Sequence, residues 1–340
     1  MATIKDVARE AGVSISTVSK IINKSSPISN ATTEKVEAVM KKLHYYPNTR
    51  ARNFARQTTK NIIYMMKIEK NVAFTNPHSF EIMCGIQEAL SKKDYNLTLV
   101  NSNSEEDIAK FIDKIIYQKS ADGIIIHASA FDPTIENVIT TSNFPHVLIG
   151  KPDYNSALCW VDINNYLSGE ITAKHVIELG YKKIAFIGGT PDDQISAHRL
   201  EGARTIINRS HSSLLHNKHT DSSKKMSYEV MDQILNESPL PDTVICANNN
   251  IALGVVDAIK YNNFQIPDDI SVITFDDYPY SRITEPMLSV VNIDVFDMGC
   301  QAAKTLLRKI KNPNLQVQSY STLPLLIERG STVKSKKTDV

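Results

Sequence analysis

The sequence predicts a small all-helical head with a helix-turn-helix, followed by two doubly wound α/β lobes. Three observations support this fold class. Apolar residues recur at helical spacing over residues 3–46, whereas short continuous apolar runs alternate with helical segments from residue 61 onward. The charge also divides, because residues 1–60 hold eleven Lys and Arg against four Asp and Glu in a chain of net charge +1. A basic segment confined to one end of a neutral chain is typical of a nucleic-acid-binding domain.

Residues 3–23 are expected to form two short helices around a tight turn. Thr3 is placed to cap the first helix, and Gly12 to end it, because glycine tolerates the left-handed conformation of a helix C-cap. Ser14 or Ser16 can cap the second helix. Short polar groups and one cation on the outer face of that helix suit insertion into the DNA major groove, although an ordinary helical hairpin is the alternative. The outward residues are Ile15, Ser16, Thr17, Ser19, Lys20 and Asn23.

A third amphipathic helix is expected to begin near Ser29 or Asn30, and residues 47–60 to form a linker. Within the linker, residues 49–57 have the length of two helical turns and display three arginines. Such a short cationic helix is marginal alone in water, so a flexible basic linker is the alternative.

The motif of the head is long and specific. It reads D-V-A-x-x-A-G-V-S-x-x-T-V-S, then E-K-V, then Y-x-P-N-x-x-A-R, and it resembles the lactose/galactose repressor family of bacterial transcription regulators over residues 2–330. The resemblance implies a homodimeric repressor, not an enzyme, that binds palindromic double-stranded operator DNA. It also implies a hinge helix that enters the minor groove, where Phe54 replaces the usual leucine. The expected DNA contacts are Thr3, Ser14, Ile15, Ser16, Thr17, Ser19, Lys20, Asn23, Ser29, Thr32, Asn48, Arg50, Ala51 and Phe54.

The remainder of the chain alternates strands and helices. Continuous apolar runs are typical of parallel strands buried on both faces. The expected strands cover residues 62–68, 97–101, 123–127, 146–150, 158–161, 183–188, 243–247, 271–275 and 289–293, whereas the polar segment 208–225 is expected to be a loop. The resemblance implies a periplasmic-binding-protein-like core whose chain crosses between the lobes near residues 161, 293 and 321. This divides the chain into a head (1–46), a hinge (47–60), an N-lobe (61–161 and 294–321), a C-lobe (162–293 and 322–330) and a disordered tail (331–340).

A ligand site is expected where the parallel strands end. Asp276, Arg199, Asn248 and Trp160 follow or flank expected strands, and a carboxylate, a guanidinium, an amide and an aromatic face together suit a sugar. The resemblance supports these four as effector contacts. Alternatively, Asp276 caps a turn, Arg199 pairs with an acid and Trp160 lies in the core. The complete set of expected effector contacts is Phe74, Asn76, Phe80, Lys151, Trp160, Arg199, Asn248 and Asp276.

The sequence points to a small-molecule effector, a mono- or disaccharide, and to no cofactor or metal. The segment G-K-P with Trp160 downstream resembles repressors of maltose and α-glucoside genes. A purine or other non-sugar effector, or control by a phosphorylated carrier protein, remains the alternative. The first 20 residues are charged and amphipathic, no apolar run approaches the length of a membrane span, and the four cysteines have no paired spacing. These features predict a cytoplasmic protein, and His216 and His219 are expected in a solvated loop.

Overall fold

The computed structural model describes residues 2–23, 25–46, 58–68, 70, 77–104, 107–315 and 319–333. They belong to two compact units, Met1–Lys60 and Asn61–Val340, and each unit is described by itself. Within the described ranges, no helix is both long enough and apolar enough to cross a membrane.

The head contains three helices, α1 (Ile4–Ala11), α2 (Ile15–Asn23) and α3 (Asn30–Lys42). Thr3 and Asp6 form a capping box at the start of α1, in which each side chain accepts a hydrogen bond from the backbone N–H of the other. Gly12 ends α1 with φ 64°, as the sequence predicts. Val7, Val18 and Val36, one from each helix, are fully buried in the small core that holds the three helices together.

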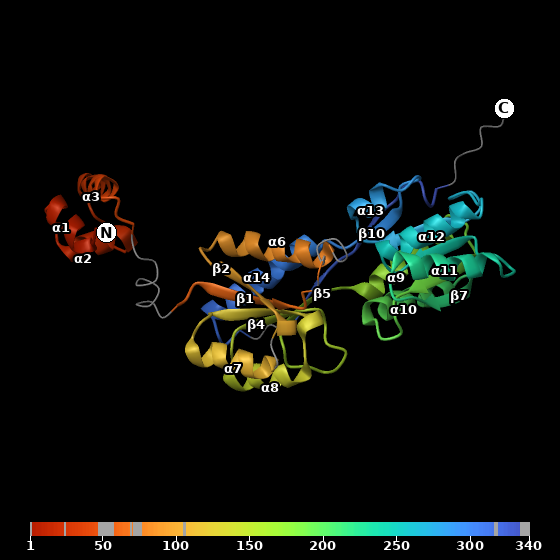
Figure 1. Cartoon of the computed structure of the whole chain (residues 1–340), viewed down its shortest axis with the longest axis horizontal. Coiled ribbons are helices and arrows are strands. Elements are labelled where there is room, and N and C mark those ends of the chain that lie inside the picture. The colour runs from red at the N-terminus through yellow and green to blue at the C-terminus, as the bar shows by residue number, and fades with distance from the viewer. Residues whose placement is uncertain are drawn as a thin grey trace, which may run out of the picture. The chain divides into compact units, whose positions relative to one another are not determined.

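The N-lobe is a six-stranded parallel sheet in the order β11-β5-β4-β3-β1-β2. Helices α6 and α14 cover one face, and α7 and α8 cover the other (Figure 1), each pair with its own apolar cluster. The bounds are β1 Asn61–Met66, β2 Asn96–Asn101, β3 Gly123–His127, β4 His146–Ile149, β5 Trp160–Ile163, β11 Ser319–Thr322, α6 Pro77–Ser91, α7 Ile108–Gln118, α8 Pro133–Ser142 and α14 Val295–Lys311, with short 3₁₀ turns η1 Ser102–Ser104 and η2 Ala128–Ala130.

The C-lobe repeats this architecture in the order β12-β10-β9-β8-β6-β7, with only β12 antiparallel to its neighbour among the described strands. Strands β8 and β9 are buried along their whole length, which explains their continuous apolar sequence. The bounds are α9 Asn165–Glu178, β6 Lys183–Gly188, α10 Gln194–Asn208, β7 Ser213–His219, α11 Lys224–Leu235, β8 Thr243–Cys246, α12 Asn249–Tyr261, β9 Ser271–Phe275, α13 Pro279–Arg282, β10 Ser289–Asn292 and β12 Leu325–Ile327.

Three chain segments join the lobes, and each is short. The chain leaves the N-lobe between β5 and α9, returns between β10 and α14, and crosses again between β11 and β12.

Glycines bring two helix pairs into backbone contact, one pair in each lobe. In α6 and α14, a Cβ at Gly85 would collide with the carbonyl oxygen of Phe296, and a Cβ at Gly299 would collide with that of Ile82. The relation is reciprocal, and α9 and α10 repeat it: Gly169 faces the carbonyl of Arg199, and Gly202 faces that of Tyr166. Only glycine permits this approach, so the spacing of each pair is fixed by its backbones.

Two sequence predictions about the fold are wrong. Residues 208–225 are not all loop, because β7 pairs in parallel with β6 and carries His216 and His219. It is an edge strand with only half-buried and exposed residues, and so it lacks the apolar run of a central strand. The tail does not begin at residue 331, because the side chains of Ser331 and Thr332 are buried against β10 and donate to or accept from its backbone and Ser289.

Candidate functional site: the cavity between the lobes and the head surface

A cavity of about 330 Å³ lies between the two lobes of the core. It is lined by residues at or just beyond the carboxyl ends of strands β3, β4, β5, β8 and β9, where ligands of doubly wound folds bind. Its volume falls in the range of small-molecule sites. Polar lining residues from both lobes are His78, His127, Asp162, Asn165, Asp193, Arg199, Ser222, Asn248, Asn249, Asn250, Asp276, Tyr278 and Tyr280.

Asp276 lies at the centre of this arrangement. It follows β9 directly, has a positive φ of 71°, and is 1% exposed. An aspartate tolerates this left-handed conformation better than most residues, but it remains an uncommon one. Neither carboxylate oxygen makes a hydrogen bond within the described residues. The nearest ionisable groups are the imidazole of His78, whose Nε2 atom lies 2.8 Å from Oδ2, and the guanidinium of Arg199, whose Nη2 atom lies 3.8 Å from Oδ1.

Arg199 is held from several sides. Its Nε donates to Oδ1 of Asn165 at 3.1 Å, and its Nη1 donates to the carbonyl oxygen of Ala247 at 2.6 Å. The guanidinium carbon also lies 4.3 Å from the ring centroid of Phe275, a cation–π geometry. Burial lowers the pKa of Arg199, and the charge of Asp276 acts in the opposite direction. Arginine remains protonated even so, and the result is a rigid cation at the cavity wall.

Asn248 and Asn249 begin helix α12 at the same wall. The side chain of Asn248 caps the helix by accepting from the N–H of Ile251. Asn249 donates to the carbonyl oxygens of Phe275 and Asp276, so it holds the end of β9 in place. Its own Oδ1 is buried without a hydrogen-bond partner.

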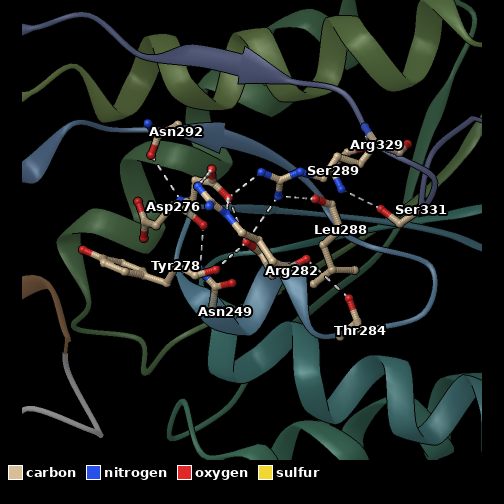
Figure 2. A network of polar contacts seen from close by, with 12 residues as sticks. Asn249, Asp276, Tyr278, Arg282, Thr284, Leu288, Ser289, Asn292, Arg329 and Ser331 are labelled. Carbon is tan, nitrogen blue, oxygen red and sulfur yellow. Dashed lines mark hydrogen bonds and ion pairs between the residues drawn. The ribbon is translucent and has the colours of Figure 1, made fainter.

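A polar network fixes the segment that presents Asp276 (Figure 2). The next residue, Asp277, accepts from Arg282 and from Arg329, each at 2.6 Å. Burial alone would raise the pKa of Asp277, but these hydrogen bonds outweigh it and hold the pKa at about 2. The backbone N–H of Asp277 also donates to Asn292 of β10. Asp276 is therefore followed by Asp277, a carboxylate that is bonded to Arg282 and Arg329 and does not line the cavity.

The N-lobe wall contributes groups of different character. Asp162 accepts from the backbone N–H of Lys151 and of Ile163, and burial raises its pKa. Loss of solvent, with a smaller effect of His78, lowers the pKa of His127 to about 4, so this imidazole is neutral near pH 7. His78 also packs edge-on against Tyr278 of the other lobe, with ring centroids 4.7 Å apart.

Not all expected effector contacts lie at the cavity. Arg199, Asn248 and Asp276 line it, whereas Phe80, Lys151 and Trp160 are absent from the described lining. Trp160 is the first residue of β5 and packs against the apolar cluster under α7 and α8, because the strand runs 160–163 and not 158–161. The side chain of Phe80 is 49% exposed on α6, and Lys151 is exposed. The remaining two, Phe74 and Asn76, lie outside the described residues.

Several lining residues are outside the set of expected effector contacts. Asp162 lies two residues along the strand from Trp160, and His127 ends β3, so strand-end position is a signal for both. His78 and Tyr278 meet only across the lobes, and no local pattern indicates that contact.

The head presents the expected DNA-contacting face of α2. Ile15 is 45% exposed, and Ser16 and Lys20 are exposed as well. Ser14 caps α2 by accepting from the N–H of Thr17, and Ser29 caps α3 by accepting from that of Thr32. Further expected contacts, Thr3, Ser19 and Asn23, lie on α1 and α2 or at their ends, with Asn23 donating to the carbonyl of Ser19. Asn48, Arg50, Ala51 and Phe54 fall outside the described residues.

A helix-turn-helix head and a two-lobed core with a polar cavity together define a class of protein, the ligand-controlled DNA-binding regulators. The family model described as "Bacterial regulatory proteins, lacI family" matches residues 3–48, and that of the "Periplasmic binding protein-like domain" matches residues 173–332. Similarity to curated members extends over nearly the whole chain. The chain belongs to the lacI family of bacterial regulatory proteins, whose members are transcription regulators and not enzymes.

Three relatives illustrate the range of the family. The chain is 31% identical to the ribose operon repressor of Escherichia coli (strain K12), over 97% of this chain and 100% of the relative. It is 33% identical to the HTH-type transcriptional regulator RegA of Clostridium saccharobutylicum, over 98% and 100%. It is 30% identical to the HTH-type transcriptional repressor PurR of Haemophilus influenzae (strain PittEE), over 98% and 99%.

A solved structure supports the fold. The Lac repressor dimer bound to operator and the anti-inducer ONPF aligns with a TM-score of 0.80 at 24% identity, covering 98% of this chain and 99% of that one.

Proposed function

We propose that this regulator represses carbohydrate-utilisation genes and that a small sugar, a mono- or disaccharide, binds between its lobes as the effector. The observation that carries the proposal is the buried carboxylate of Asp276, which lines a cavity together with His78, Arg199, Asn248 and Asn249. Charged and amide groups fixed in a small cavity suit the vicinal hydroxyls of a sugar, which donate and accept hydrogen bonds at once.

The proposed operator complex is a homodimer on palindromic DNA in the cytoplasm. Two heads would place α2 in successive major grooves, with Ile15, Ser16 and Lys20 toward base edges. The other expected head residues would contact phosphates and make the affinity depend on salt. We assign the head to residues 1–46, the hinge to 47–60 and the effector-binding and dimerisation core to 61–333, since Ser331 and Thr332 are buried in the C-lobe.

Control would act through the relation between the lobes. A ligand that binds only when the lobes enclose the cavity favours the closed arrangement, and a differential affinity of about 1–3 kcal/mol changes operator occupancy many-fold. The sign of the response, induction or corepression, follows from whichever arrangement binds the operator.

The test has two stages. Selection of bound DNA from a random pool by the full-length protein should recover a palindrome, and the same selection with individual sugars should change the recovered amount. Recovery of a palindrome that responds to no sugar but to guanine or hypoxanthine would replace the sugar effector by a purine. A response to a phosphorylated carrier protein alone would move control away from the cavity.

A further inference from the structure

The charged groups that line the cavity are predominantly acidic. Among the described residues, the lining holds three carboxylates, Asp162, Asp193 and Asp276, against one guanidinium, Arg199. His127 adds no positive charge near pH 7, since its pKa is about 4. His78 is the other imidazole at the wall, and its Nε2 faces Asp276. A ligand that enters therefore meets a net negative environment.

The positive charge of Arg199 is already compensated inside the protein. Its donors are directed to Asn165, to the carbonyl of Ala247 and toward Asp276. A phosphate-binding arginine would instead direct its planar fork to the ligand, with no carboxylate in competition. The site therefore lacks the cation that an anionic effector requires.

Most of the unfilled hydrogen-bonding capacity at the cavity is that of an acceptor, and the buried hydroxyl of Tyr278, which can donate or accept, also has no partner among the described residues. Oδ1 of Asp276 and Oδ1 of Asn249 are buried and have no hydrogen bond among the described residues, and Oδ2 of Asp276 faces the Nε2 atom of His78 at 2.8 Å. A buried acceptor without a donor is unfavourable, so a ligand that supplies donors gains from filling it. Hydroxyl groups supply donors, whereas carboxylates and phosphate dianions supply acceptors only.

His127 shows how the opposite wall serves the same ligand. Its Nδ1 accepts from the backbone N–H of Ser129 at 3.1 Å, so the neutral ring carries its proton on Nε2 and offers a donor. Hydroxyl oxygens accept such donors, and the same hydroxyls donate to Asp276. An uncharged polyol thus matches both kinds of group.

We propose that the cavity selects uncharged, polyhydroxylated sugars and rejects their phosphorylated and carboxylated forms. This inference rests on the proposed function and names the chemical class of the effector. Repulsion of a dianion by carboxylates in a partly desolvated site should reduce affinity by at least about 100-fold relative to the matched neutral sugar.

The experiment is calorimetric titration of the full-length protein at pH 7.5 (a value near neutrality at which phosphate monoesters are dianions). The probes are D-ribose, D-glucose and D-fructose, each with its terminal phosphate ester, together with D-galactose and D-galacturonate, and guanine. We expect a neutral sugar to bind and its anionic counterpart to bind at least about 100-fold more weakly. Equal or tighter binding of an anion, or binding of guanine alone, would overturn the inference. Binding of no probe would count against the proposed sugar effector itself, which is a distinguishable result.

A charge-removing variant tests the cause. Asp193→Asn removes one lining carboxylate yet keeps a residue that caps α10 as well as aspartate does. The ratio between neutral and phosphorylated sugar should fall several-fold in D193N. The matched control is Asp132→Asn, the same substitution at the N-cap of α8, away from the cavity lining. An unchanged ratio in D193N, or an equal change in D132N, would mean that the lining charge does not set the selectivity.

Discussion

Replacing Arg199 by methionine should destabilise the core strongly, because a carboxylate would remain buried without its cation. The side chain is 3% exposed, so methionine fills most of its volume while removing the charge and both hydrogen bonds. At the 3.8 Å separation from Asp276, an effective dielectric constant of about 20 gives an attraction of about 4 kcal/mol. Removal of one partner of a buried pair commonly costs about 3–5 kcal/mol, which is the loss that we expect here.

The assay is urea unfolding of the full-length protein followed by circular dichroism, on R199M, D276N and the double variant. The double variant should lose less free energy of unfolding than the two single variants together, by about 1–3 kcal/mol. Effector binding should be lost in R199M, whereas the head, a separate compact unit, should remain folded. Additive losses, within about 0.5 kcal/mol, would refute the coupling between the two side chains.

Three further predictions follow from other parts of the chain. Gly169→Ala forces a Cβ against the backbone of Arg199, so it should lower the free energy of unfolding by about 1–3 kcal/mol and also weaken effector binding. Thermal unfolding and calorimetry measure the two effects. A loss of stability with unchanged affinity would mean that the position of α9 does not affect the site. Burial lowers the pKa of His146 to about 4, so the unfolded chain takes up the proton first, and this group alone should reduce the stability of the core by about 2 kcal/mol between pH 6.5 and pH 5. His146→Gln should remove this share from the urea-unfolding profile and leave the share of His127, whose pKa is also about 4; an unchanged profile would contradict the assignment. Thr3→Ala removes the hydroxyl of the capping box of α1 and should destabilise the head by about 1 kcal/mol, which would lower the melting temperature of the head and weaken operator binding. The Thr3→Ser variant keeps a hydroxyl and should retain the original melting temperature and operator affinity.

The sequence predicts those parts of the fold whose burial is uniform. The bounds of β3, β6 and β9 agree with the expected ranges, because each is a continuous apolar run covered on both faces. β7 could not be predicted in this way, because it lies at the sheet edge, most of its residues are polar, and its pairing with β6 decides its structure. β11 and β12 are too short for any periodicity, and they too depend on their neighbours.

The site divides in the same way. Asp276 and Asn248 follow strands of predictable position, and the structure brings both to the cavity with Arg199. β5 lies two residues later than expected, so Asp162 and not Trp160 is found near the carboxyl end of the strand. Side chains two residues apart point to the same face of the sheet but lie at different positions along the strand. Contacts between the lobes, such as that of His78 with Asp276, depend on how the two lobes pack, so no local sequence pattern predicts them.

The reciprocal glycines of the two helix pairs make each lobe resistant to internal rearrangement. At these glycines no side chain separates the two backbones, so α6 with α14, and α9 with α10, have little room there to repack. A relative motion of the lobes would therefore bend mainly the three short segments that join them. Since β1 extends from the start of the core at Asn61 toward the cavity end of the sheet, a rotation of the lobe under the proposed control by a ligand would be carried along this strand to the opposite end. The stiffness of the lobe would then decide how strongly ligand binding at the cavity is coupled to the end of the lobe at Asn61.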